Sequence, residues 1–273
     1  MSHVELTEQI IDSMRVRDPD EPVAMINLLK FRDITQPEAD MGSISGRDCY
    51  FNHYGTGVSP IADRLGTGYS LLYRNEVHSC FFATVNEDWD YLLILQYPSR
   101  RAFIEMITDP EYQELLRYRS AALTNSRLIE CVNDTPAGYP LNLQVPPPSD
   151  PIIERPGLFS DPRVNAVNGR DPKQPTDMLN LIRLAEVTRS GGGVDNMSGA
   201  EGYEEYRTGV TSLYAERAGV EITWRAFPVA TLIGPEEECW DEALIYHYQS
   251  REQMLSMFTD YDDYRVNHLP KRN

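Results

Sequence analysis

The pattern of apolar and polar positions occurs in two similar stretches of this chain. Residues 22–31 (PVAMINLLKF) and 175–184 (PTDMLNLIRL) are apolar runs of strand length. Each follows an Arg-Asp-Pro sequence, and the two copies align at a constant offset of 153 residues, with seven identities in the twelve positions from Arg17 to Leu28. Such self-similarity indicates two copies of one structural unit.

The same order of elements is predicted around both strands. Thr7 and Ser160 are equivalent capping positions before a first helix. Two strand-like stretches and a helix capped by Ser99 or Ser250 come later in each copy. In the first copy Asp109-Pro110 predicts the start of a further helical segment. Residues at helical spacing predict a further helix in each copy, namely Tyr50, Tyr54, Val58 and Ile61, and Tyr203, Tyr206, Val210 and Leu213. This order predicts an α+β fold with two ferredoxin-like units in one chain.

Proline marks the boundary between the two copies. Ten of the 19 prolines lie between Pro136 and Pro175, a density that excludes helix and central strand and favours an extended connection. We therefore predict a first unit at 3–133, a proline-rich linker at 134–155 and a second unit at 156–273.

Composition narrows the classes of function. A formal charge of −17 argues against nucleic-acid binding, which needs clustered Lys and Arg. The sequence has no apolar run long enough to span a membrane and no secretory signal at its start, so we expect a cytoplasmic protein. The four cysteines have no paired spacing, which predicts reduced thiols and no zinc site.

Several short motifs resemble the dimeric α/β-barrel superfamily, and in particular the uncharacterised family called domain of unknown function 1330. In the first copy they are Asn27–Arg32, Gly46 with Tyr50 and Tyr54, Trp89-Asp90, Tyr97–Ser99, Phe103, Asp109-Pro110 with Tyr112, and Arg119. In the second copy they are Asn180–Arg183, Gly199 with Tyr203 and Tyr206, Gly234–Glu236, Trp240-Asp241 and Ser250.

This resemblance implies that the sheets of two ferredoxin-like units enclose a barrel. The repeat implies that one chain supplies both halves, as a monomeric pseudo-dimer or as a homodimer of such chains. The superfamily includes cofactor-free cyclases, quinone-forming monooxygenases, lactone isomerases and heme-dependent enzymes, so the resemblance does not choose a reaction. The second copy departs from the first where Ala185 replaces Arg32, which favours a single asymmetric pocket.

Two pairs of equivalent polar residues are candidates for substrate binding. Asn27 and Asn180 lie among apolar neighbours in a predicted strand, where an amide must be hydrogen-bonded. Each could tie its strand to a loop or hold a substrate carbonyl. Arg74 and Arg225 end equivalent strands, where each could pair with a surface carboxylate or hold an oxyanion.

The histidines differ between the copies and are the stronger candidates for catalysis. His247 lies in a predicted strand where the first copy has Gln96, and His53 occupies a one-residue insertion beside Tyr54. A histidine titrates near neutral pH and suits general acid–base catalysis, although a strand histidine can also be structural. We name His247, His53 and Tyr54 as catalytic candidates, with Gln96 as a further substrate-binding candidate.

The sequence lacks the phosphate-loop, dinucleotide-binding and GxSxG motifs. We therefore expect a cofactor-independent enzyme that isomerises, cyclises or eliminates a small, apolar, oxygen-bearing metabolite, possibly in specialised metabolism. A non-catalytic small-molecule binding protein, a cofactor-free monooxygenase and a structural module stay open. Heme also stays open, because spacing alone does not identify a proximal histidine.

Overall fold

The protein is described here by a computed structural model that covers residues 4–36, 42–80, 87–133, 169–188, 196–218, 220–235 and 238–259. The chain divides into two compact units. Unit 1 contains Met1–Asn133 and Pro228–Cys239, and unit 2 contains Asp134–Phe227 and Trp240–Asn273. The predicted linker at 134–155 and the predicted cap Ser160 lie outside the described residues.

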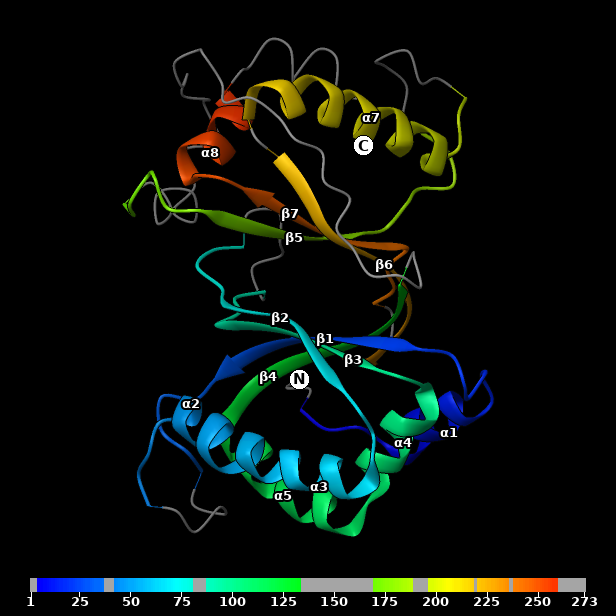
Figure 1. Cartoon of the computed structure of the whole chain (residues 1–273), viewed down its shortest axis with the longest axis vertical. Helices are drawn as coiled ribbons and strands as arrows, with labels where there is room; N and C mark the ends of the chain where they lie inside the picture. The colour runs from blue at the N-terminus through cyan, green and yellow to red at the C-terminus, as the bar shows by residue number, and fades with distance from the viewer. Residues whose placement is uncertain are drawn as a thin grey trace. The chain divides into compact units, whose positions relative to one another are not determined.

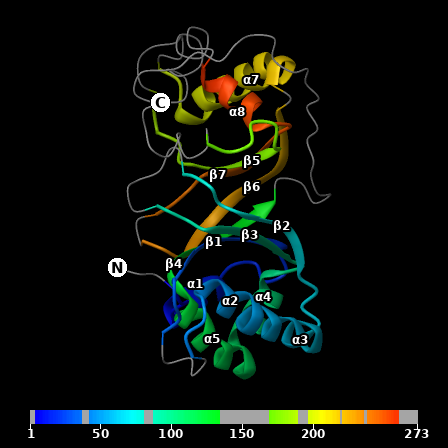
Figure 2. The ribbon, with the colours of Figure 1, turned by 90° about the vertical axis from the view of Figure 1, so that its left-hand side faces the viewer.

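Unit 1 is an antiparallel sheet covered on one face by helices (Figures 1 and 2). Its strands follow the spatial order β2-β3-β1-β4, and β1 pairs antiparallel with β3 and β4, as β2 does with β3. The elements are α1 (Glu8–Arg15), β1 (Val23–Phe31), α2 (Gly46–Cys49), the π-helical segment η2 (Tyr50–Gly55), α3 (Thr56–Leu65), β2 (Ser70–Glu76), β3 (Tyr91–Tyr97), α4 (Arg100–Thr108), α5 (Pro110–Ala122) and β4 (Leu123–Asn133). The β-α-β-β-α-β order after α1 is the ferredoxin-like one.

Side-chain caps begin the helices of unit 1 at the positions that the sequence predicts. The Thr7 hydroxyl accepts a hydrogen bond from the Ile10 amide at 3.3 Å, and the Ser99 hydroxyl accepts one from the Ala102 amide at 3.1 Å. The Asp109 carboxylate caps α5, whose first residue is Pro110. These three predicted helix starts are confirmed.

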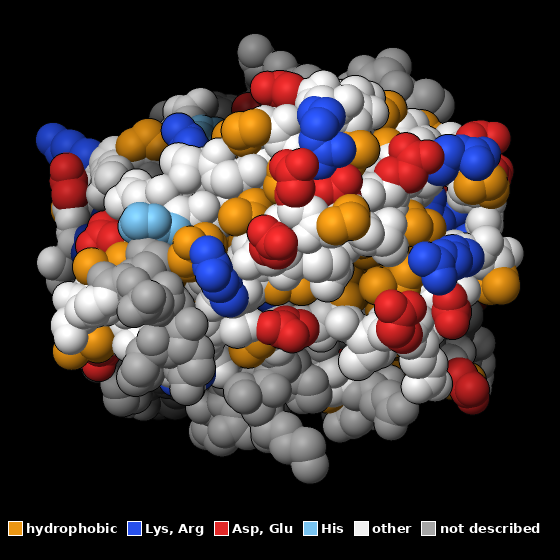
Figure 3. Space-filling model, turned by 90° about the horizontal axis from the view of Figure 1, so that it is seen from below, with side chains coloured by type: hydrophobic (Ala, Val, Ile, Leu, Met, Phe, Trp, Pro, Cys, Tyr) orange, Lys and Arg blue, Asp and Glu red, His pale blue; other side chains and the backbone are white. Residues whose placement is uncertain are grey.

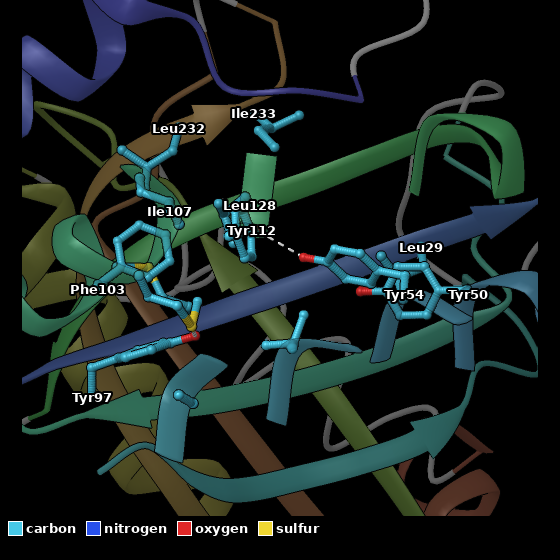
Figure 4. Packing of buried hydrophobic residues seen from close by; sticks show 14 of the residues in the cluster. Leu29, Tyr50, Tyr54, Tyr97, Phe103, Ile107, Tyr112, Leu128, Leu232 and Ile233 are labelled. Carbon is cyan, nitrogen blue, oxygen red and sulfur yellow. Dashed lines mark hydrogen bonds between the residues drawn. The ribbon is translucent and has the colours of Figure 1, made fainter. Parts of the chain in front are cut away.

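The core of unit 1 lies between the sheet and its helices. Met25 and Leu29 on β1 pack in one cluster with Tyr50 and Tyr54 from η2 and Phe103 from α4 (Figure 4). Because side chains alternate along a strand, Ala24, Ile26 and Leu28 occupy the other face of β1. They are buried as well, which explains why β1 reads as a nearly continuous apolar run.

Unit 2 repeats much of this arrangement. It contains β5 (Thr176–Ile182), α7 (Gly199–Ala218), the first part of β6 (Val220–Ile233), β7 (Glu242–Tyr248) and α8 (Arg251–Thr259). The strands follow the order β6-β7-β5, with antiparallel pairing. The last residues of β6, Pro228–Ile233, belong to unit 1, where Leu232 and Ile233 join its core.

Equivalent residues of the two units make equivalent contacts. The Asp90 carboxylate accepts a hydrogen bond from the Phe31 amide at 2.7 Å, and the Asp241 carboxylate accepts one from the Leu184 amide at 2.7 Å. A Cβ on Gly46 would lie 2.6 Å from the Arg32 carbonyl oxygen, and one on Gly199 would lie 2.0 Å from the carbonyl oxygen of the equivalent Ala185. Both positions therefore exclude a side chain.

The alignment of the two copies shifts by one residue within the helical segments that carry Tyr50 in unit 1 and Tyr203 in unit 2. Tyr50 aligns with Tyr203 at an offset of 153, whereas Tyr54 aligns with Tyr206 at an offset of 152. The extra residue of unit 1 lies within η2, whose π-helical turns hold more residues per turn than an α-helix. The insertion inferred at His53 thus coincides with a local change of helix type.

Candidate functional site

Three titratable side chains lie side by side on the sheet of unit 2. In the strand register His247 of β7 is directly opposite Asp177 of β5 on one side and Glu221 of β6 on the other. Directly opposed residues of an antiparallel pair have their Cβ atoms about 5 Å apart, close enough for their side chains to interact. We call Asp177, His247 and Glu221 the acid–base row.

His247 and Asp177 form a hydrogen bond. His247 Nδ1 lies 2.7 Å from Asp177 Oδ1, and the two side chains are 34% and 22% exposed. An ionised carboxylate only accepts hydrogen bonds, so Nδ1 carries the proton and the second ring nitrogen, Nε2, holds the lone pair. This arrangement is the one in which a carboxylate orients a histidine base.

The acid–base row lies on the face of the sheet opposite to the helices of unit 2. The neighbouring residue Tyr246 faces α7, because burial and the nearby charges of Arg207 and Glu204 on that helix act on its hydroxyl and its pKa is raised. Since successive side chains of a strand alternate, His247 points to the other face. Beside it on that face lie Ile245 and Trp224, which pair across the strands. Both are buried, so the apolar neighbours of the row belong to the protein interior.

Unit 1 has uncharged residues in the same register. Gln96 of β3 lies opposite Ala24 of β1 and Ser70 of β2. These positions are equivalent to His247, Asp177 and Glu221 at the offsets of 151 to 153 residues that relate the two copies. The scaffold thus presents one neutral row, Ala24–Gln96–Ser70, and one titratable row.

The structure gives both candidate asparagines a contact within their own strand. The Asn27 side-chain amide donates to the Met25 carbonyl at 3.1 Å, and the Asn180 amide donates to the Met178 carbonyl at 3.4 Å. Asn27 shares the face of Met25 and Leu29, which pack against helices. Asn180 is aligned with Leu244 of β7, whose side chain alternates with that of His247. The two amides therefore lie on the helix-covered faces.

The two candidate arginines also lie apart from the acid–base row. Arg225 forms an ion pair with the buried Glu242 and stacks on the Phe227 ring, with 5.1 Å from Cζ to the ring centroid. In register it lies opposite Leu244, on the helix-covered face. Arg74 is exposed on β2, opposite Leu93.

His53 and Tyr54 belong to η2 in unit 1, whereas His247 belongs to unit 2. His53 is exposed, and its ring centroid lies 5.8 Å from that of Tyr118. Tyr54 is buried, and its hydroxyl lies 2.7 Å from the Tyr112 hydroxyl (Figure 4). Burial, and then the neighbouring Tyr112, raise the pKa of Tyr54 well above its usual value. Tyr54 is therefore held protonated in the core.

Tyr54 is part of a buried polar network that joins the helices of unit 1 to its sheet. Arg119 on α5 is 4% exposed and donates to the Ser126 hydroxyl on β4 at 3.1 Å. Its guanidinium also favours the ionised form of Tyr50, although burial dominates and raises the pKa of that tyrosine. Buried polar groups of this kind fix a unique packing when they are hydrogen-bonded.

Sequence reasoning missed Asp177 and Glu221. Asp177 replaces Ala24 and Glu221 replaces Ser70, and each substitution is visible when the copies are aligned. Their proximity to His247 depends on strand register, which the sequence does not give. The described residues contain no cluster of three or more His, Cys, Asp or Glu that could hold a metal ion. They also contain no helix that is long and apolar enough to cross a membrane.

Charged side chains elsewhere on the surface are of mixed sign. The face of unit 1 that carries α3 and α5 shows basic and acidic side chains interspersed (Figure 3). Arg64 of α3 forms an ion pair with Asp109, the residue that caps α5, with 2.8 Å between Nη2 and Oδ1. Nucleic-acid binding would instead need basic residues gathered on one surface.

Comparisons with known proteins identify similar solved structures, but they do not assign an activity to this chain. No protein-family model and no curated protein matches the chain. A crystal structure of a protein of unknown function from Rhodopseudomonas palustris, a structural genomics target, is 30% identical, with a TM-score of 0.44 and alignment over 50% of this chain and 100% of that chain. The methylated form of that protein is 31% identical, with a TM-score of 0.45, over 50% and 98%. A mutant chlorite dismutase from Candidatus Nitrospira defluvii is 9% identical, with a TM-score of 0.43, over 94% and 87%.

Proposed function

We propose that the chain is a cofactor-independent enzyme in which His247, oriented by Asp177, is the general acid–base. The substrate is a small, largely apolar, oxygen-bearing molecule, and the reaction is an isomerisation, a cyclisation or an elimination. The hydrogen bond of 2.7 Å between His247 Nδ1 and Asp177 Oδ1 is the observation that supports this proposal. We further propose a pseudo-dimeric α/β barrel, as the family resemblance implies, and a cytoplasmic location.

The chemistry follows from the hydrogen bond between Asp177 and His247. The Asp177 carboxylate accepts a hydrogen bond from Nδ1–H of His247, which leaves the Nε2 lone pair to take a proton from a bound molecule. The imidazolium that forms is stabilised by Asp177, and by Glu221 on its other side. His247 then returns the proton to a different atom of the bound molecule, so that the residue ends in its starting state.

Proton abstraction can be measured without knowledge of the natural substrate. A nitrobenzisoxazole is an apolar, oxygen-bearing probe whose ring opens to a coloured phenolate when a base removes its carbon-bound proton. His247→Gln should lower the rate of ring opening by about a hundredfold or more, because the base is lost. Asp177→Asn should lower it as well, because the amide favours the wrong tautomer. Arg101→Gln, at an exposed position of unit 1 outside every candidate site, is the control and should retain the rate of the unmodified chain.

Two results would reject the proposal. Equal rates for the unmodified chain and His247→Gln would remove His247 as the base. Saturable binding of the probe without any ring opening, in a chain that retains its fold by circular dichroism, would instead support the non-catalytic binding protein.

A further inference from the structure

A buried ion network joins three elements of unit 1. The Glu130 carboxylate on β4 is fully buried and accepts hydrogen bonds from Arg17, ahead of β1, and from Arg100 at the start of α4. Arg100 also lies 2.8 Å from the Glu21 carboxylate and donates to the Asp18 carbonyl. Glu130 reaches this place because β4 pairs with β1, with Glu130 opposite Met25.

Unit 2 retains the arginines of this network. Arg170 is equivalent to Arg17 and Arg251 to Arg100. Arg251 is 3% exposed, and its guanidinium donates to the Asp171 carbonyl, as Arg100 does to Asp18. The backbone contact is repeated as well, because the Arg251 amide donates to the Gln174 carbonyl at 2.9 Å and the Arg100 amide donates to the Glu21 carbonyl at 2.8 Å. The two sites are therefore built alike.

The carboxylates of the network differ between the units. Gln174 replaces Glu21, and its side-chain oxygen lies 3.5 Å from the Arg251 guanidinium. Among the described residues no carboxylate pairs with Arg251 or occupies the place that Glu130 has in unit 1. A buried guanidinium without a counter-ion is unfavourable, so this position would gain from an anion.

The pKa values of Arg100 and Arg251 are shifted in opposite directions. Burial disfavours the charge of Arg100, but the Glu21 and Glu130 carboxylates more than offset this, and the pKa of Arg100 is raised. Burial and then the neighbouring charge of Arg170 lower the pKa of Arg251. Unit 2 thus holds two adjacent cations where unit 1 holds a balanced network.

The described part of unit 2 also has no strand equivalent to β4, which carries Glu130 in unit 1. In unit 1 the strand β1 lies between β3 and β4, whereas in unit 2 its equivalent β5 is the last strand of the order and pairs with β7 alone. The outer edge of a strand presents amide and carbonyl groups that can pair with an added strand. Every residue of β5 is partly exposed, in contrast to the buried β1.

We propose that the outer edge of β5, together with Arg170 and Arg251, is a docking site for an extended peptide segment that carries a carboxylate in register with Met178. The β5 edge supplies the backbone hydrogen bonds, and the two arginines select the acidic side chain. The contacts of β4 and Glu130 in unit 1 are the template for this assignment. The proposal goes beyond the acid–base function; the two sites share strand β5, which carries Asp177, but Arg170 and Arg251 are not part of the acid–base row.

The probe for this site is a fluorescein-labelled peptide with the sequence of residues 123–133, LTNSRLIECVN, added to the full chain in reducing buffer. Fluorescence anisotropy should show saturable binding. A peptide with glutamine at the position of Glu130 should bind about tenfold more weakly or worse, because the charge-assisted hydrogen bonds are lost. A peptide N-methylated on the amides that face β5 should lose binding, because its backbone no longer donates.

Substitutions in the protein, instead of the peptide, test the same site. Arg251→Gln should weaken binding of the peptide about tenfold or more, and the exposed Arg170→Gln provides a second test in a variant that keeps the buried arginine. Arg101→Gln, an exposed arginine of unit 1, is the control and should leave binding unchanged. The proposal is overturned if the peptide does not bind, if the glutamine peptide binds equally well, or if free glutarate binds as tightly as the peptide, which would indicate a site for small anions.

Discussion

The same strand register holds a neutral row in unit 1 and a titratable row in unit 2. Ala24, Gln96 and Ser70 lie where Asp177, His247 and Glu221 lie in the other copy. The shared residues that surround them, such as the aspartates that bind the end of the first strand in each copy, keep the backbone alike. The comparison teaches that the two copies share one strand register while the side chains of this row are neutral in unit 1 and titratable in unit 2.

A second difference runs in the opposite direction. Unit 1 has the complete ion network of Arg17, Arg100 and Glu130, whereas the described part of unit 2 has only the arginines. Among the described residues, unit 1 therefore has the balanced buried ion network, and the outer edge of β5 in unit 2 has no strand partner.

The largest predicted effect compares the two buried arginines. Arg100→Met should lower the free energy of unfolding by about 3–5 kcal/mol, because it leaves the fully buried Glu130 without its partner. Arg251→Met should change it by less than about 1 kcal/mol or stabilise the chain, because no carboxylate loses its partner. Urea unfolding monitored by fluorescence measures both. Equal losses would show that the two networks do not differ energetically.

A smaller effect should appear at alkaline pH, from the buried tyrosines of unit 1. Burial raises the pKa of Tyr112 to about 12, whereas an unfolded tyrosine ionises near 10. Between these values only the unfolded state loses the proton, so stability should fall as the pH rises, by up to about 2–3 kcal/mol from this group. The loss should be complete near pH 12 and absent below about pH 9.

Tyr112→Phe tests this assignment in unfolding measurements repeated across that pH range. The variant should show a shallower loss of stability with pH, although its Tyr54 hydroxyl loses its partner at every pH. Tyr69→Phe, whose hydroxyl is at an exposed position, is the control. A slope unchanged in Tyr112→Phe would assign the alkaline loss to other groups.

Much of the scaffold could be predicted from the sequence. Capping residues and apolar periodicity act locally, so Thr7, Ser99 and Asp109 were predicted as helix starts and are observed as such. The insertion at His53 was visible because the repeat provides its own alignment. The closure of a barrel by the two units stays a prediction. So do the catalytic roles of His53 and Tyr54 and the substrate-binding roles of Asn27, Asn180, Arg74, Arg225 and Gln96.

The candidate site could be predicted only in part. His247 differs from Gln96 and was therefore noticed, but Asp177 and Glu221 lie 70 and 26 residues before it in the chain. Only strand pairing brings the three together, and a register shift between Ile222 and Trp224 shows why alternation along β6 alone would mislead. The sequence also does not show which face of the sheet Asn27 occupies, because β1 is apolar on both faces.

The tautomer of His247 tests the central claim most directly. In a chain labelled with ¹⁵N at histidine, two-bond correlations between ring protons and ring nitrogens identify which nitrogen is protonated, and His247→Gln assigns the signal. The account predicts that neutral His247 carries its proton on Nδ1, and that Asp177→Asn removes this preference while Gln96→Ala leaves it unchanged. A proton on Nε2 in the unmodified chain, or a tautomer indifferent to Asp177→Asn, would contradict the claim that Asp177 orients His247 as a base.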